Sequence, residues 1–253
     1  MYLEVIFLKP GKSYYELNAQ QINPEFIEGL PEKKAEGERG GLDNKVVIRT
    51  FKVSNIAGIT INGAGTWGLT LYDNAIIQST GGNIGITANG TTGGLYIDST
   101  IGHILASNMT VAPTTATPTA GGTLTINAST SSSGQGALIY NGSLISYGAM
   151  SLTTRGRGGS QGLYVGGTGA FKSVGDLTID AATTGASWGM QLESGRVIQS
   201  TAGNVSVTGV GDYGVYMNGS IVASNDTANP TTATPTSGGT LTINATGRTN
   251  YGL

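Results

Sequence analysis

The chain has 253 residues, among them 42 glycines, 34 threonines and 21 serines, and only 11% of its residues are charged. A hydrophobic share of 38% excludes the composition of a disordered chain, and the absence of cysteine excludes disulfides and thiolate chemistry. A net charge of −2 argues against nucleic-acid binding, and no apolar run approaches the roughly 18 residues of a membrane helix, so neither partner is expected.

Charge divides the chain into two parts. Residues 1–52 carry eight basic and eight acidic side chains, whereas residues 53–253 carry five and seven. We therefore expect a charged N-terminal segment over 1–44, acting as a cap or leader, and a second domain over 45–253. Within the first segment, the sequence predicts a strand over 1–8 and a short helix over 23–28, with Asn23 as the N-cap of the helix. The apolar start is interrupted by Glu4 and does not resemble a secretory signal.

The second part is an internal repeat. Trp67-Gly68-Leu69 recurs as Trp188-Gly189-Met190, and the PTTATPT segment at 113–119 recurs at 230–236. A smaller unit of 25–27 residues lies inside this repeat, lengthened wherever PTTATPT is inserted. Each unit contains a glycine that opens an apolar alternation, at Gly68, Gly94, Gly136, Gly162, Gly189, Gly214 and Gly252.

Each unit also contains three strand-like pieces with apolar residues at every second position, the period of a strand with one buried face. The first pieces align as Ile59/Ile61, Ile84/Ile86, Leu124/Ile126, Met150/Leu152, Leu177/Ile179, Val205/Val207 and Leu241/Ile243. The second pieces align as Leu69/Leu71, Leu95/Ile97, Ala137/Ile139, Leu163/Val165, Met190/Leu192 and Val215/Met217. The third pieces are expected to start at Phe51, Ile76, Ile104, Leu144, Phe171, Val197 and Ile221.

This pattern predicts an all-β, single-stranded parallel β-helix of about seven coils with three short strands per coil. Each coil would return the chain one strand spacing further along an axis, which gives a rod of about 34 Å. Like residues would then stack on like, with apolar columns inside and hydroxyl columns outside. A repeating two-layer sandwich is the alternative, and it would require short antiparallel hairpin turns.

The strings at 175–181 (GDLTIDA), 203–208 (GNVSVT) and 239–245 (GTLTINA) resemble the repeat of bacterial filamentous haemagglutinins and related autotransporter-type adhesins. The resemblance extends over 45–253. It implies a right-handed β-helix in a secreted or surface-displayed bacterial stalk used for cell adhesion. The Asn-Pro-Asn motifs of that family's secretion domain are not matched by Asn23-Pro24-Glu25, and the repeat domain is expected to be part of a longer array.

Residues with catalytic chemistry are few, so the chain is not expected to be an enzyme, and no catalytic residue, metal site or cofactor is predicted. His103, the single histidine, is interpreted as an exposed corner residue. Asp176 and Asp180 share one strand face but would lie about 13 Å apart, beyond the roughly 5–9.5 Å of glycosidase carboxylates. A polysaccharide lyase or hydrolase of the tailspike type, using these acids with Asp212 and Arg157, remains the alternative.

Three surface features are candidate binding sites. Tyr96, Tyr164 and Tyr216 lie between inward positions of the second strand, where exposed rings could contact glycans or, as the alternative, pack on their neighbours in the sheet. Strict alternation in the third strand would expose an apolar stripe for lateral association between rods: Ile77, Leu105, Ile145, Ile198 and Val222. The alternative is a bend in this strand that buries both neighbouring apolar residues. Eight Asn-x-Ser/Thr sequons are present, and the candidates for N-glycosylation are Asn108, Asn127, Asn225 and Asn244.

Together these features predict an adhesive, surface-displayed rod whose partners are host or matrix glycans or proteins, with possible lateral self-association. A third hypothesis is an ice-binding solenoid, because a hydroxyl column containing Thr60, Thr125, Thr178 and Thr242 runs along the first strand. Gly85, Ser151 and Ser206 interrupt that column.

Overall fold

The structure is a computed structural model, and it describes residues 4–5, 46–49, 52–55, 58–72, 75–98, 103–109, 117–168, 170–225, 234–249 and 251–252. Among these residues every regular element is a β-strand, and the strands form a parallel β-solenoid of about six turns. The predicted helix over 23–28 lies outside the described residues. From the N-terminal segment, β1 (Glu4–Val5) pairs antiparallel with β2 (Val46–Arg49).

Three strand positions recur along the chain, as the sequence predicts. The first position is occupied by β4 (Ile59–Tyr72), β6 (Ile84–Asp98), β8 (Leu124–Thr130), β11 (Met150–Gly156), β14 (Leu177–Thr183), β17 (Val205–Gly211) and β20 (Leu241–Gly247). The second is occupied by β2, the later halves of β4 and β6, β9 (Ala137–Tyr140), β12 (Leu163–Gly166), β15 (Trp188–Leu192) and β18 (Tyr213–Met217). The third is occupied by β3 (Lys52–Asn55), β5 (Ile76–Ser79), β7 (His103–Ala106), β10 (Ser143–Ser146), β13 (Ala170–Ser173), β16 (Val197–Ser200) and β19 (Ser220–Ala223).

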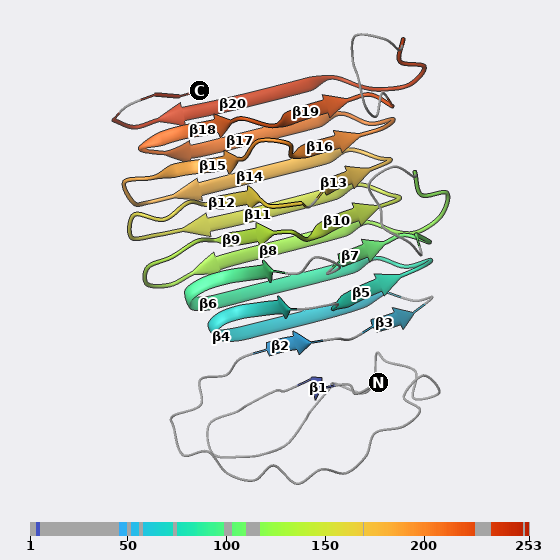
Figure 1. The fold of residues 1–253 in the computed structure, drawn as a ribbon, viewed down its shortest axis with the longest axis horizontal. Helices are drawn as coiled ribbons and strands as arrows, with labels where there is room; N and C mark the ends of the chain where they lie inside the picture. Colours follow the sequence, from blue (N-terminus) through green and yellow to red (C-terminus); the bar gives the residue numbers. More distant parts are fainter. Residues whose placement is uncertain are drawn as a thin grey trace, which may run out of the picture.

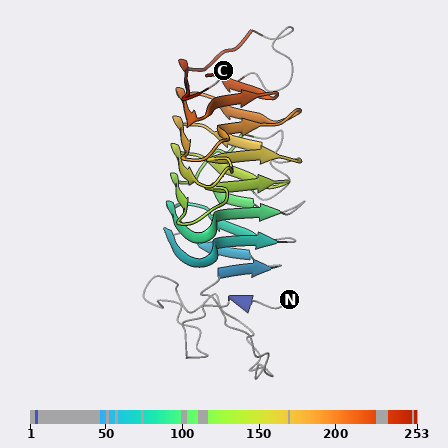
Figure 2. The same cartoon turned by 90° about the vertical axis from the view of Figure 1, so that its left-hand side faces the viewer.

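These strands stack into two parallel sheets that wind around one axis (Figure 1). The first and second positions, together with β1, form a 13-stranded sheet, and the third position forms a seven-stranded sheet. Six turns are complete among the described residues, with partial turns at both ends, so the expectation of about seven coils is slightly high. Figure 2 shows the turns lying one above another along the axis.

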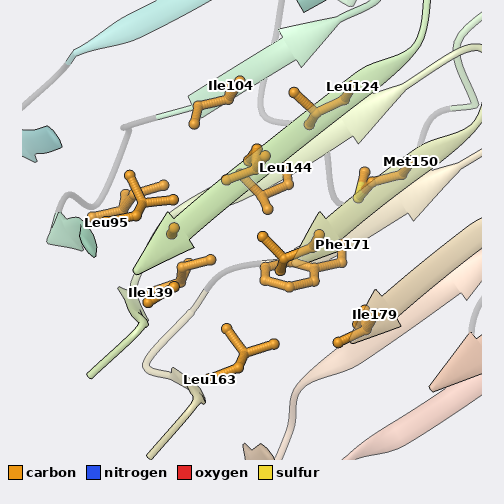
Figure 3. Packing of buried hydrophobic residues seen from close by; sticks show 14 of the residues in the cluster. Leu95, Ile104, Leu124, Ile139, Leu144, Met150, Leu163, Phe171 and Ile179 are labelled. Carbon is orange, nitrogen blue, oxygen red and sulfur yellow. The ribbon is translucent and has the colours of Figure 1, made fainter. Parts of the chain in front are cut away.

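The core is made of apolar columns that follow this stacking. Leu124 lies between Ile84 and Met150 in the registers of β6, β8 and β11, which is the alignment predicted from the sequence. The predicted second-strand alignment is confirmed in the same way, with Leu163 between Ala137 and Met190. Figure 3 shows side chains from all three strand positions meeting in the interior. Full burial of each such side chain contributes roughly 1.5–3 kcal/mol to the free energy of folding. Because every coil buries these side chains against its neighbours, stability comes from repeated contact between coils.

The third strand differs from the prediction by one residue in two coils. Ile77 pairs with Ile104, and Ile198 pairs with Phe171, so these residues enter the core in place of Ile76 and Val197. Phe51 lies outside the described residues. The physical reason is that this strand is apolar on both faces, so alternation cannot identify which face is the inner one.

Polar side chains at one corner connect successive coils. The side-chain oxygen of Asn83 accepts a hydrogen bond from the Thr123 amide at 2.9 Å. Oδ1 of Asp176 accepts from the Asn204 amide at 2.8 Å, and Oδ1 of Asn204 accepts from the Thr240 amide at 2.9 Å. These bonds satisfy amides just before the chain enters the first strand, and they fix the corner of each coil over the previous one.

Candidate functional site

The outer face of the second strand carries two groups of aromatic side chains. We name Trp67, Tyr72 and Tyr96 the first aromatic platform, and Trp188, Tyr213 and Tyr216 the second aromatic platform. Both groups join rings from two successive coils. Each is therefore created by the stacking of coils and does not exist within a single repeat unit.

The first aromatic platform is centred on Tyr96 of β6. Its ring centroid lies 5.0 Å from that of Trp67 and 5.5 Å from that of Tyr72, the latter pair being edge to face. The Tyr96 hydroxyl donates a hydrogen bond to Asp98 at 2.9 Å. Burial, with smaller contributions from that bond and from the nearby Asp98 charge and Tyr72, raises the pKa of Tyr96 to about 12. The Trp67 ring lies over Gly93, where a Cβ would leave no room for it.

The second aromatic platform is centred on Trp188 of β15. Its ring centroid lies 4.7 Å from that of Tyr213 and 5.3 Å from that of Tyr216, both in β18. Tyr216 is 37% exposed. A hollow of about 280 Å³ adjoins the platform, lined by Trp188, Val215, Tyr216, Met217 and Tyr251. This volume is close to the lower limit of small-molecule sites, about 300–1,000 Å³.

The two platforms are built on equivalent positions of the internal repeat. Trp188 follows Trp67 by 121 residues, and Tyr216 follows Tyr96 by 120. The strand order places four rungs between the two tryptophans, from β4 through β6, β9 and β12 to β15. Four spacings of 4.8 Å give about 19 Å along the axis. The third ring differs, because Tyr213 occupies the position of Gly93 in the first platform.

The three predicted tyrosines therefore have different surroundings. Tyr96, Tyr164 and Tyr216 share one column, but Leu138 and Gln191 lie between them. The structure brings Tyr96 and Tyr216 into the two platforms, whereas the Tyr164 ring lies over Gly166 of its own strand. Burial raises the pKa of Tyr164, with further effects from Glu193 and Tyr140.

Sequence reasoning missed Trp67 and Trp188 as site residues. Their recurrence identifies the repeat, but it does not show that they contact the column tyrosines. That contact depends on which coil lies above which, as the registers Trp67–Gly93 and Trp188–Tyr213 now show. A tryptophan repeated at the same offset as a column tyrosine is the signal that could have found them.

The expected apolar stripe on the third strand is not exposed. Ile77 and Ile198 point into the core, and Leu105 and Ile145 form a second buried cluster with Met109. Of the five candidate residues, Val222 alone is partly exposed. The expectation of an exposed stripe is wrong for two reasons. Ile77 and Ile198 lie on the inner face, and Met109, which follows β7, packs on Leu105 and Ile145.

Polar side chains on the same face of the third sheet are buried as well. The amide nitrogen of Gln78 donates to the carbonyls of Ser107 and Met109, at 3.0 and 2.6 Å. Gln199 donates in the same way to the carbonyl of Ser224 at 2.8 Å. Lys172 is 3% exposed on this face, and burial lowers its pKa.

The two Thr/Pro insertions have the same neck. Asn108 accepts hydrogen bonds from the amides of Thr119 and Ala120, at 3.1 and 3.3 Å, and its amide nitrogen donates to the Thr119 hydroxyl at 2.9 Å. Asn225 makes the three equivalent bonds to Thr236 and Ser237. Residues 110–116 and 226–233, between these necks, lie outside the described part of the chain.

The glycosylation candidates thus fall into two classes. Asn108 and Asn225 use both atoms of their side-chain amides to close the necks. Asn127 and Asn244 are exposed on the outer faces of β8 and β20. N-glycosylation stays a prediction at all four positions.

The candidate acids make structural contacts. Asp180 forms an ion pair with Arg155 at 2.5 Å, and Asp176 accepts the corner hydrogen bond described above. Asp212 lies 3.6 Å from Arg248. His103 is buried at the start of β7, which corrects the expectation of an exposed corner residue. Within the described ranges, no three His, Asp or Glu side chains are grouped closely enough to hold a metal ion.

Comparison of the chain with protein-family models, with curated proteins and with solved structures finds no match. A search of the described residues for a helix long and apolar enough to cross a membrane also finds none.

Proposed function

We propose that this chain is a structural and adhesive rod, secreted or displayed on a bacterial surface in the manner of filamentous haemagglutinin-like adhesins. One observation carries the proposal: surface features recur in step along a solenoid. Both the aromatic platforms and the insertion necks occur twice, four rungs apart. A rod with repeated features can bind an extended partner through many weak contacts, each of which adds avidity.

The polysaccharide-cleaving alternative predicts a groove in which acids and bases converge. The acids that could serve such a reaction do not converge: Asp176 accepts a corner hydrogen bond, whereas Asp180 and Asp212 each lie beside an arginine. Each of these contacts joins two neighbouring coils. The structural role therefore accounts for these residues without a reaction.

The test uses the purified chain with a panel of bacterial, plant and host polysaccharides and matrix proteins. Binding and product chain length are recorded in the same samples. Binding without shortening of the polymer is the expected result. Shortened products would overturn the proposal and direct mutagenesis to Asp176, Asp180, Asp212 and Arg157. Absence of binding to every polysaccharide and protein would also overturn the adhesive role.

The ice-binding candidate is favoured by one observation. The hydroxyl column of the first strand is in register, with Thr125 paired to Ser151 and Ser151 to Thr178. Its threonines are exposed, but Gly85 lies between Thr60 and Thr125. Thermal hysteresis of a dilute solution tests this candidate, and its absence would remove it.

A further inference from the structure

We infer that the two aromatic platforms are equivalent binding sites for sugar rings of a neutral polysaccharide, and that one polymer chain spans both. This inference rests on the proposed adhesive function and specifies its ligand. It assigns Trp67 and Trp188, together with Tyr96 and Tyr216, as the contact residues.

The chemistry follows from the rings. The face of a sugar ring presents C–H groups, and aromatic side chains offer large apolar surfaces that lose little conformational entropy when they bind. In each platform a tryptophan and a tyrosine lie 5.0–5.3 Å apart with their planes tilted by 34° or 54°. All four rings are partly exposed on the outer side of the second strand. Such tilted pairs present a ridged surface suited to one ring at a time.

Polar groups beside the rings can orient a sugar. In the first platform, Asp98 accepts a hydrogen bond from Tyr96 and retains further acceptor capacity for a hydroxyl. Near the second, Glu193 accepts from Gln191 at 2.6 Å, and Gln191 accepts from Gln161 at 2.7 Å. Carboxylates next to aromatic rings suit the hydroxyl groups of a neutral sugar.

The same carboxylates determine the charge of the ligand. Asp98 lies in the first platform, and Glu193 is hydrogen-bonded to Gln191, which pairs with Tyr216 of the second platform. A uronic or sulfated polymer would bring like charge next to both groups, which is unfavourable. Neutral polysaccharides are therefore preferred over acidic ones.

The presence of two platforms on one rod favours a polymeric ligand. The platforms lie about 19 Å apart on one rigid solenoid, so a chain bound at one platform holds its next segment near the other at high effective concentration. A disaccharide can occupy either platform but cannot span them. The polymer should therefore bind much more tightly than the disaccharide only while both platforms are intact.

Binding can be followed by intrinsic fluorescence, because the chain has two tryptophans and each platform contains one of them. Tryptophan emission is titrated with mannan and dextran as neutral polymers, with the corresponding disaccharides, and with alginate as an acidic polymer. The variants Trp67→Phe and Trp188→Phe leave one reporter each, so each platform is observed alone. Both reporters are expected to respond to a neutral polymer and to respond much less to alginate.

Affinity is then measured for Trp67→Ala, Trp188→Ala and the double variant. We expect each single variant to lose about 100-fold in affinity for the polymer, with little change for the disaccharide at the remaining platform. The double variant should lose binding of both. Tyr147→Ala is the matched control, because Tyr147 is an exposed aromatic residue outside both platforms. Tyr216→Ser provides a second variant at an exposed ring, and circular dichroism confirms folding of each protein.

The outcomes separate this inference from the adhesive proposal. Polymer binding that survives the double variant would overturn the platforms as the site while leaving an adhesive rod. Preference for alginate would overturn the neutral ligand. Equal losses in the single and double variants would overturn the two-site arrangement. Binding to matrix proteins alone would overturn the glycan inference and keep the adhesive role, whereas no binding to any partner would overturn both.

Discussion

Glycines at one corner of each coil allow the coils to approach closely. Six of the seven glycines recognised in the sequence, all except Gly252, lie where the second strand begins, against the end of the first strand of the next coil. A Cβ on Gly162 would lie 2.5 Å from the Gly189 carbonyl oxygen and 2.6 Å from the Ala182 amide nitrogen. Backbone cannot move away from such a contact without separating the coils. The glycine period is therefore a packing requirement at this corner.

Gly162→Ala is expected to destabilise the solenoid by roughly 1–3 kcal/mol or more, because the added methyl overpacks against backbone. Gly85→Ala is the matched control, since its Cβ would meet nothing within 4 Å. That change should be neutral or stabilising by about 0.4–1 kcal/mol. Urea unfolding of the two variants and the parent measures both values. Equal effects of the two substitutions would contradict the packing argument.

The phenol of Tyr96 predicts a pH dependence of stability. Its pKa in the folded protein is about 12, above the usual 10.0, so the protonated phenol stabilises the fold. This contribution is complete below pH 10 and is lost as pH rises from 10 towards 12. Tyr96→Phe should therefore show a smaller decrease of Tm over that interval than the parent, with Tyr147→Phe as the exposed control. Parallel Tm curves for the parent and Tyr96→Phe would refute this assignment.

Alternation predicted the elements well where one face of a strand is exposed. The first and second strands have apolar residues inside and polar or hydroxyl residues outside, so their registers could be read from the sequence. The third strand could not be read in this way, because Leu105 and Ile145 are covered on the outer face by Met109. For the same reason the expected stripe was wrong. The aromatic platforms needed knowledge of neighbouring coils, which a strand-by-strand interpretation does not contain.

The insertion neck is closed by the Asn108 side chain together with a backbone bridge between Ser107 and Gly121. Asn108→Ala removes the acceptor for two amides and a donor to Thr119, so the neck should open more often. We expect the amides of Thr119 and Ala120 to exchange with solvent faster, with a loss of about 1 kcal/mol in local stability. Hydrogen exchange measured by NMR reports this directly. Asn127→Ala, on the outer face of β8, should leave these amides protected.

Over the whole molecule, stability and length should follow the number of coils. Met150 and Leu177 occupy the same place in successive coils, so deletion of residues 150–176 removes one complete turn and leaves a continuous register. The shortened chain should fold, unfold at lower denaturant concentration, and be shorter by about 4.8 Å. Circular dichroism with small-angle scattering tests this expectation. A collapsed or unfolded product would show that the turns are not equivalent.

The parallel stacking of turns also determines how the molecule would respond to force. Hydrogen bonds between neighbouring turns point along the axis, so tension between the two ends pulls directly on those of the outermost turn before any other. Yielding would then proceed turn by turn, each step releasing a coil of 25–27 residues, or a longer one where PTTATPT is inserted. At about 3.4 Å per extended residue, each step lengthens the tether by nearly 90 Å. Such a rod would extend under traction by shedding end turns while the remaining turns keep their shape.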